Sequence, residues 1–549
     1  MEMRPYRAIF GLPIKETGYM RLFTPLPRLA TRLVSLFVLG AWGVAMAVLV
    51  HTSYIEARSA SLATDLARYG AAAEWRGVYY RGEKIGFSVS QTVPASSPDG
   101  TDGFELQEDA RLQMSLLGAT TPAAIHTTAR VDRAFSLQSF EFSLDPGTGP
   151  VVVRGTVTGT RLALTITSAG ATRTEARTLD EPPALSLNLA RRLAGSGLRP
   201  GARYHWFMFD PATLRNEPVA IEVGRRELGI NSRPTPAFRV DMEFAGLRTT
   251  SWITDTGDVV REESPLGLIT IRESPERARA TAISGQMRTD LLRAAAVVPT
   301  GRTQIDDARN VRRLKLRVTG LDANAADLQG GSQRVAGDIV DLVDPRTLTA
   351  GPPDGAAERY LAAEPFIESD DPDIRTEAER AVAGVTGDRA RAERLTRYVN
   401  GLLDKKPTVS LPSAREVLRT KVGDCNEHTV LLVAMARALG IPARISVGLV
   451  YVHGAFYYHA WPEVYVDAIW LPVDPTLNEF PADTTHLRVA RGGLDKQAAV
   501  LPLIGRLTIA VLDVEVEPDS VPILAGSKPV DLGAIAIPLR RRDSCCVCR

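Results

Sequence analysis

The sequence predicts an α+β protein in three parts: an N-terminal transmembrane helix, an antiparallel β-rich domain, and a second domain in which helices precede a small sheet. Three observations lead to this prediction. Residues 33–50 carry no charged side chain, residues 75–299 alternate apolar and polar side chains, and residues 355–516 show helical periodicity followed by strand-like runs. Helices grouped before antiparallel strands are typical of an α+β layer arrangement.

The length and charge of the chain set its outer limits. A chain of 549 residues is long enough for roughly three or four domains. The predicted divisions are residues 1–55 (a cytoplasmic basic segment and membrane anchor), 56–299 (the β-rich domain), 300–354 (a linker with one strand), 355–516 (the second domain) and 517–549 (a C-terminal tail). The 65 basic and 64 acidic residues nearly balance, so we expect no nucleic-acid partner.

The uncharged segment at residues 33–50 is near the lower end of the ~17–25 residues that a membrane-spanning helix needs. The charged residues among 1–32 are mostly basic, six against two acidic, which places the N-terminus in the cytoplasm. We therefore expect a single-pass inner-membrane protein that contacts the cell membrane through this helix, with most of the chain in the periplasm. A cleaved signal peptide is the alternative, although Ser61-Leu62-Ala63 is a poor cleavage site.

Short strands joined by glycine turns are expected through the β-rich domain. The predicted features are a hairpin at residues 79–87, a hairpin at 151–166, a turn at Thr256-Gly257-Asp258 and a helix at 185–194. This pattern predicts an antiparallel sheet or a partial barrel. His126 and His205 are isolated, and we interpret both as structural. The domain is either a scaffold or a binding surface for a substrate or an envelope component, and the sequence does not choose between them.

The regions around the second domain are predicted from local patterns. Residues 311–319 are predicted to form a strand, and the Gly- and Pro-rich segment 351–355 marks a boundary. Residues 395–402 carry an apolar stripe at helical spacing. Ser413 begins a capping box, which predicts a short helix. Residues 501–516 regain strand character and are expected to complete the sheet.

Cys425 is predicted to be the first residue of a buried helix. Gly423 permits a tight turn, Asp424 is a favourable N-cap, and Glu427 has the spacing of a capping box. The apolar run that follows ends at Gly440, as helices commonly do. The dipole of a helix favours a thiolate at this end, and its unpaired amides would stabilise a developing oxyanion. The position therefore indicates a reactive thiol.

A hairpin downstream brings a histidine and a carboxylate together. Residues 456–466 and 469–476 have β propensity, and Asp467-Ala468 is the predicted two-residue turn. With that register His459 and Asp474 become diagonal neighbours on one face, within roughly 7–8 Å. A carboxylate there fixes the tautomer of the imidazole and supports its charge. Cys425, His459 and Asp474 are thus a candidate nucleophile, base and orienting group.

Four motifs around these residues resemble the transglutaminase-like superfamily of papain-like cysteine enzymes. They are Gly423-Asp424-Cys425, Leu439-Gly440-Ile441-Pro442-Ala443-Arg444, His459-Ala460-Trp461 and Val473-Asp474-Pro475-Thr476. They occur in the order and at the spacing of the family, within residues 376–476. One departure is the turn, where the family often has Asp-Gly and this chain has Asp467-Ala468. The resemblance implies a papain-like α+β fold for the second domain.

The resemblance also implies a catalytic triad of Cys425, His459 and Asp474 and no cofactor. The expected function is a membrane-anchored extracytoplasmic cysteine protease, amidase or acyltransferase that cleaves or transfers amide bonds of a protein or peptide substrate through a thioester. The family also includes members that have lost catalysis. The alternative is therefore a non-catalytic module that binds a peptide or glycan in the same cleft.

Other residues near the site have alternative interpretations. His428 lies one turn after Cys425 and is a second candidate base, although a structural role suits it better. His453 is a candidate for lining the cleft, and Trp461 is interpreted as a core aromatic. The spacing of the cysteine, histidines and acidic residues matches no zinc pattern, so we expect no metal. The three cysteines of residues 545–548 are interpreted as part of a flexible end.

Overall fold

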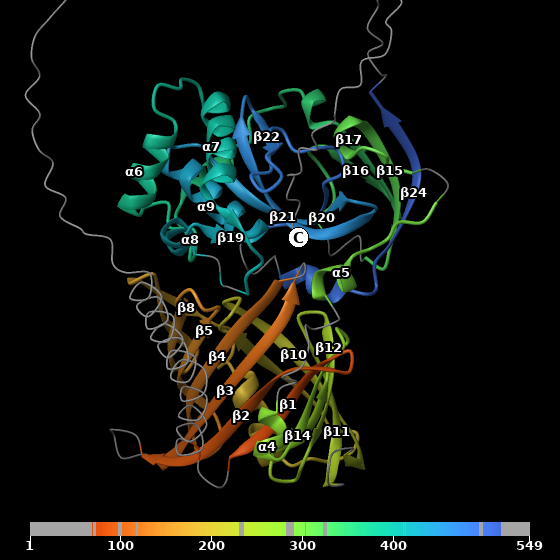
Figure 1. Cartoon of the computed structure of the whole chain (residues 1–549). Helices are drawn as coiled ribbons and strands as arrows, with labels where there is room; N and C mark the ends of the chain where they lie inside the picture. Colours follow the sequence, from red (N-terminus) through yellow and green to blue (C-terminus); the bar gives the residue numbers. More distant parts are fainter. Residues whose placement is uncertain are drawn as a thin grey trace, which may run out of the picture. The chain divides into compact units, whose positions relative to one another are not determined.

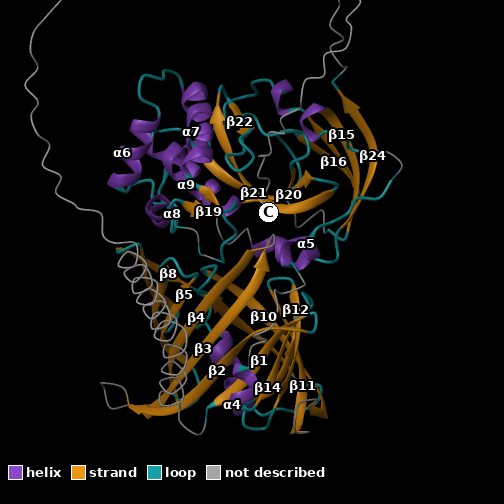
Figure 2. Cartoon of the chain, in the orientation of Figure 1, coloured by secondary structure: helices purple, strands orange, loops and turns teal. Residues whose placement is uncertain are grey.

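The computed structural model describes residues 69, 73–96, 102–116, 119–229, 235–280, 290–301, 304–321, 327–409, 411, 413–492 and 498–517. The predicted membrane-spanning segment at 33–50, the basic segment before it and the C-terminal cysteines lie outside the described residues. Figure 1 and Figure 2 show three helices, α6 (Pro372–Ala381), α7 (Asp388–Leu402) and α8 (Ala414–Thr420), around α9 (Cys425–Ala438). Strands β20 (Ala443–Val452), β21 (Ala455–Val466) and β22 (Ile469–Pro472) lie next to them.

The N-terminal half of the described chain forms one antiparallel sheet. Its strand order is β8-β7-β6-β5-β4-β3-β2-β1-β14-β13-β12-β11-β10-β9, so each strand pairs with its neighbour in sequence except where β1 meets β14. The strands are β1 (Glu74–Tyr80), β2 (Glu83–Ser96), β3 (Asp102–Leu116), β4 (Ala119–Asp132), β5 (Leu137–Asp145), β6 (Val151–Thr158), β7 (Arg161–Ser168), β8 (Ala171–Thr178), β9 (Arg203–Asp210), β10 (Arg215–Gly229), β11 (Thr235–Phe244), β12 (Leu247–Ile253), β13 (Val259–Glu263) and β14 (Leu268–Glu273).

The predicted features of this region are confirmed. Gly82 and Gly159 sit in the turns of the β1–β2 and β6–β7 hairpins with positive φ, which only glycine adopts without strain. The predicted helix is α3 (Ser186–Gly195), whose buried residues join an apolar cluster with β9, β10 and β11. Two short helices follow the sheet, α4 (Pro275–Arg279) and α5 (Leu291–Ala295).

The second domain combines four helices with a four-stranded sheet. The helices are α6 (Pro372–Ala381), α7 (Asp388–Leu402), α8 (Ala414–Thr420) and α9 (Cys425–Ala438). The sheet has the order β22-β21-β20-β23, from β20 (Ala443–Val452), β21 (Ala455–Val466), β22 (Ile469–Pro472) and β23 (Leu487–Arg491). A short parallel pair, β18 (Asp404–Lys405) and β19 (Val422–Gly423), leads into α9.

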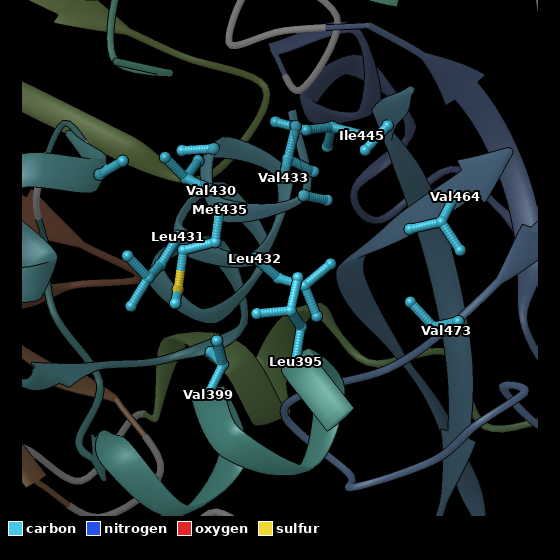
Figure 3. Close-up of a cluster of buried hydrophobic side chains, with 14 of the residues drawn as sticks. Leu395, Val399, Val430, Leu431, Leu432, Val433, Met435, Ile445, Val464 and Val473 are labelled. Atoms are coloured by element: carbon cyan, nitrogen blue, oxygen red, sulfur yellow. The ribbon is translucent and has the colours of Figure 1, made fainter. Parts of the chain in front are cut away.

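Helix α9 is the centre of this domain. Every residue from Glu427 to Arg437 is buried, because α6, α7 and α8 pack on the helix from one side and β20 and β21 from the other. Figure 3 shows Leu431, Leu432 and Met435 of α9 beside Leu395 and Val399 of α7. The apolar stripe that predicts α7 is therefore the face that covers α9.

A third sheet supports strands β20 and β23. Its order is β16-β17-β15-β24, from β15 (Val311–Thr319), β16 (Gln333–Ala336), β17 (Ile339–Val343) and β24 (Thr508–Val516). The strand predicted at 311–319 is confirmed. The strand at the end of the domain pairs with β15 instead of completing the sheet that carries His459. The 3₁₀ helices are η2 (Ala308–Asn310), η3 (Pro345–Thr347), η4 (Ala357–Leu361) and η5 (Ala498–Leu503).

Two broader sequence-based predictions, the fold class and the location, are also wrong. Strands make up 50% and helices 20% of the structure, so the fold is mostly β instead of α+β. The α+β prediction treats the helices of residues 372–438 as equal in extent to the strands. The sheet formed by β1–β14 is far larger than this group of helices.

The second wrong prediction is the single-pass inner-membrane location with most of the chain in the periplasm. Within the described ranges, no helix is long and apolar enough to cross a membrane. The longest helix there, α7, has 15 residues, fewer than the ~20 that a span requires.

Replacing Leu432 by alanine tests the central role of α9. The side chain is 0% exposed, so the substitution leaves a cavity that should cost about 2–5 kcal/mol of unfolding free energy. Urea or thermal unfolding measures the loss. The matched control is Leu228→Ala in β10, where the leucine is 65% exposed and the change should stay within about 0.5 kcal/mol. Equal losses in the two variants would contradict this description of the core.

Candidate active site

Cys425 is the first residue of α9 and is half-buried. Asp424 caps the helix, because its carboxylate accepts hydrogen bonds from the amides of Asn426 and Glu427. The Glu427 carboxylate in turn accepts a hydrogen bond of 2.9 Å from the Asp424 amide. This is the capping box that the sequence predicts. Gly423 precedes it because a Cβ at that position would lie 2.2 Å from the Cβ of Glu427.

The cap changes the electrostatics of the first turn. The amides of Asn426 and Glu427 donate to Asp424, so they are not the oxyanion donors that the sequence analysis expects. Burial and the neighbouring Glu427 carboxylate raise the pKa of Asp424 well above its usual range. The raised pKa favours the neutral form of Asp424, and less negative charge beside Cys425 leaves the helix dipole to favour a thiolate.

The hairpin that carries the candidate base has the predicted register. Val466 pairs with Ile469 and Glu463 with Pro472, as a two-residue turn requires. Asp467 and Ala468 both have positive φ, 53° and 57°, which is the geometry of a type I′ turn. The alanine in place of the family's glycine therefore leaves the turn type unchanged.

His459 and Asp474 are brought together by this hairpin. Nε2 of His459 lies 2.7 Å from Oδ2 of Asp474, and the Asp474 side chain is fully buried. The other oxygen, Oδ1, accepts hydrogen bonds of 2.7 and 2.9 Å from the amides of Thr476 and Leu477. The carboxylate is therefore fixed in place. Because Nε2 contacts Asp474, Nδ1 is the ring nitrogen of His459 that can accept a proton from another group.

Helix α9 is pinned to the strand that carries His459. The hydroxyl of Thr429 donates a hydrogen bond of 3.0 Å to the carbonyl of Ala460, the residue after His459. Thr429 lies four residues after Cys425, so the two share one helix face. The start of α9 is thereby held against the segment of β21 that carries the imidazole.

His486 is a fourth member of the site and lies outside the sequence motifs. Its Nε2 lies 3.1 Å from Oδ2 of Asp474, the same oxygen that contacts His459. Its Nδ1 lies 3.0 Å from Oδ1 of Asp483. The sequence offers only one indication, a histidine directly before the buried strand β23. The loop between Asp474 and β23 has no periodic pattern, so only the folded chain shows where that histidine points.

Strand β23 is anchored directly after His486. Glu463 of β21 forms ion pairs with Arg444 at 2.6 Å, Arg488 at 3.2 Å and Arg491 at 3.1 Å. Burial opposes the charge of Glu463, but the three guanidinium groups outweigh it and lower the pKa to about 2. The network joins β20, β21 and β23 and so fixes the strand on which His486 depends.

The buried groups of the site hold opposite charges. Burial alone would raise the pKa of Asp474, but the contacts with His459 and His486 outweigh it and hold the pKa well below its usual range. Burial also opposes the charge on His486, yet the hydrogen bonds to Asp474 and Asp483 raise its pKa well above the usual value. Asp474 is therefore a carboxylate and His486 an imidazolium at neutral pH.

The same side chains are a possible set of metal ligands. One ligand atom each from His459, Asp474 and His486 lies within 4.8 Å of the others, and Glu479, Asp483 and His486 form a similar group. The contacts of 2.7 and 3.1 Å at Asp474 are ordinary hydrogen-bond distances. In each of them the Nε2 atom of a histidine ring faces Oδ2 of Asp474 as its acceptor. The geometry therefore fits a hydrogen-bonded chain without a metal.

The remaining candidates have other positions. His428 is fully buried, with Nδ1 2.6 Å from the carbonyl of Asp424, and burial lowers its pKa. It therefore braces the first turn of α9 and is poorly suited to carry a proton. His453 is exposed at the β20–β21 turn with φ 46°. Trp461 is buried, and its ring stacks 6.1 Å from that of His459, so it is a wall of the site as well as a core residue.

Replacing Asp474 by asparagine tests the buried charge. The variant leaves two imidazoles beside a neutral amide, and removing one partner of a buried pair typically costs about 3–5 kcal/mol. The control is Asp467→Asn in the same hairpin. Asp467 pairs with Arg389 at 3.2 Å with both side chains largely exposed, so that loss should be about 0–1 kcal/mol. Thermal unfolding at pH 7 compares the two, and similar losses would show that Asp474 does not act as a buried charge.

Comparisons with solved structures find distant likenesses. A candidate cysteine protease from Cytophaga hutchinsonii shares 19% identity over 38% of this chain and 86% of that chain, with a TM-score of 0.25. A β-barrel-like protein of a domain of unknown function from Brucella abortus shares 11% over 37% and 96%, with a TM-score of 0.29. A candidate protease from Parabacteroides distasonis shares 11% over 73% and 66%, with a TM-score of 0.17. No curated protein matches the sequence.

The family match comes from the sequence itself. The family model of the transglutaminase-like superfamily matches residues 375–475. The matched segment runs from α6 through α9 and the β20–β22 strands to the residue after Asp474. It contains Cys425 and His459 as well as Asp474. Residues 375–475 of this chain belong to the transglutaminase-like superfamily.

Proposed function

We propose that this domain is a cysteine enzyme that cleaves or transfers amide bonds through a thioester on Cys425. The observation that carries the proposal is the 2.7 Å contact between His459 and Asp474, next to the strand segment to which α9 is pinned. An imidazole fixed by a buried carboxylate serves as the base of a cysteine nucleophile. The superfamily match supports the same type of chemistry.

The proposed reaction has two steps. The Cys425 thiol gives its proton to Nδ1 of His459, and the sulfur attacks the carbonyl carbon of the amide. The carbon–nitrogen bond breaks, the departing amine takes the proton from His459, and a thioester remains. Water or a second amine then attacks the carbonyl carbon of the thioester and gives a proton to His459. The carbon–sulfur bond breaks, and the proton passes from His459 to the sulfur, which restores the thiol. Water completes an amidase or protease reaction, and an amine completes a transfer.

Asp474 supports both steps without changing its own protonation. Its buried carboxylate fixes the ring of His459 through Nε2 and stabilises the positive charge that His459 carries after it takes the thiol proton. The hydrogen bonds from Thr476 and Leu477 keep the carboxylate from turning away. A protein or peptide is the substrate class that fits amide chemistry.

Paired histidine substitutions test the role of His459. His459→Asn should lower the rate of thioester formation by at least about 10³-fold, because the base is lost. His453→Asn is the matched control, because His453 lies in the exposed turn just before the strand that carries His459. Asparagine tolerates the positive φ of that position. The measurement is alkylation of Cys425 by iodoacetamide at pH ~6, where only an activated thiol reacts quickly, followed by peptide mass spectrometry.

Cys425→Ala gives the second control, in which acyl transfer from amide substrates should stop. Full activity in that variant would exclude the thioester mechanism. An inert Cys425 in a protein that still binds peptides or glycans would favour the non-catalytic alternative. Release of the acyl group to labelled water or to an added amine separates hydrolysis from transfer.

A further inference from the structure

The carboxylate of Asp474 is shared by two imidazoles, and a triad needs only one. His459 and His486 both contact Oδ2, at 2.7 and 3.1 Å, while their rings lie 5.8 Å apart in an edge-on arrangement. His486 has a side chain only 3% exposed, so solvent does not account for its position. A fully buried histidine between two carboxylates is expensive to place and is therefore expected to have a role.

We propose that His486 is a positioning residue of the triad that holds the Asp474 carboxylate toward His459 and, through its positive charge, keeps that carboxylate ionised. The inference rests on the proposed function, because it assigns His486 a role in the proton transfers of Cys425 and His459. It adds a fourth member to the nucleophile, base and orienting group.

The positioning part follows from the contacts. Oδ1 of Asp474 is held by two backbone amides, and Oδ2 is held from two sides by the imidazoles. Without His486, the carboxylate would have a single side-chain partner and a buried lone pair without a donor. Such a carboxylate is free to rotate or draw in water, and the ring of His459 would then lose its fixed orientation.

The charge part follows from the groups that face His486. Asp474 and Asp483 contact its two nitrogens, Trp461 lies edge-on at 5.1 Å, and Glu479 is close enough to act on it electrostatically. Burial and the carboxylate of Asp483 raise the pKa of Glu479 to about 7. At neutral pH, two carboxylates therefore keep His486 charged while Glu479 is only partly ionised.

A charged His486 stabilises the ionised form of Asp474. The oxygen that it contacts is also the one that contacts His459. Loss of His486 therefore weakens the carboxylate that orients the candidate base.

His486→Gln separates charge from position. The amide of glutamine can still donate to Asp474, but it carries no charge. The value of kcat/KM should stay within about 10-fold of that of the unchanged protein, because the donor is retained. His486→Ala removes the donor as well and should lower kcat by about 10–100-fold, with KM little changed. His453→Gln, at an exposed position, should leave both constants unchanged.

Asp483→Asn provides a second variant that does not touch Asp474. Asparagine keeps the oxygen that accepts hydrogen bonds from the amide and hydroxyl of Thr485, but it withdraws the charge that helps to keep His486 protonated. The loss of kcat should be smaller than in His486→Ala. An equal loss of kcat in folded His486→Gln and His486→Ala, or no loss in either, would overturn the positioning role of His486.

A readout that needs no substrate separates this inference from the proposed function. Full-length protein labelled with ¹³C-histidine reports the ring environment of His459, whose signal His459→Asn identifies. That signal should shift or broaden in His486→Ala and change little in His486→Gln, even if the protein has no amide activity. Activity lost in Cys425→Ala with an unchanged His459 signal in His486→Ala would retain the proposed function and overturn the role of His486. One equivalent of tightly bound zinc that His486→Gln releases would also overturn it, because His459 would then be a ligand.

Discussion

The arrangement of the candidate site depends on one buried carboxylate. Asp474 is completely covered, and each of its oxygens is held by two donors, from the backbone on one side and from His459 and His486 on the other. A buried carboxylate without such donors would be protonated or would expose itself to water. Its ionised state fixes the tautomer of His459 and the charge of His486. The loop that returns from Asp474 to β23 has to close in one conformation for all these contacts to form.

Helix α9 supplies the second constraint, because it fixes the position of Cys425 through packing. The helix is buried along nearly its whole length, and its N-terminus is closed by the reciprocal bonds of Asp424 and Glu427. The cap uses two amides that could otherwise bind an oxyanion. It also lets the helix begin sharply at Cys425. The hydrogen bond from Thr429 then ties this turn to β21. If Cys425 is the nucleophile that we propose, stability and reactivity depend on the same helix, since a rigid core is needed to hold a nucleophile in place.

Much of this domain could be predicted from local patterns. The capping box at Asp424, the end of α9 near Gly440, the two-residue turn at Asp467 and the strand at 311–319 all follow from chemistry within a few residues. The His459–Asp474 contact was also predictable, because a hairpin with a known turn fixes which residues face each other. His486 was not predictable in this way. Its contacts depend on an irregular loop and on a strand order, β23 beside β20, that no local signal encodes.

The sequence by itself determined the local elements and the candidate residues Cys425, His459 and Asp474, because caps, turns and alternating strands depend on neighbours in the chain. Tertiary structure alone decided the proportion of strand, the pairing of the last strand with β15 and the second imidazole on Asp474. These features join segments that are far apart in the sequence. They are stabilised by burial and by the charge of a carboxylate shared between two imidazoles. Both interactions form only when the chain has folded, so local sequence patterns do not reveal them.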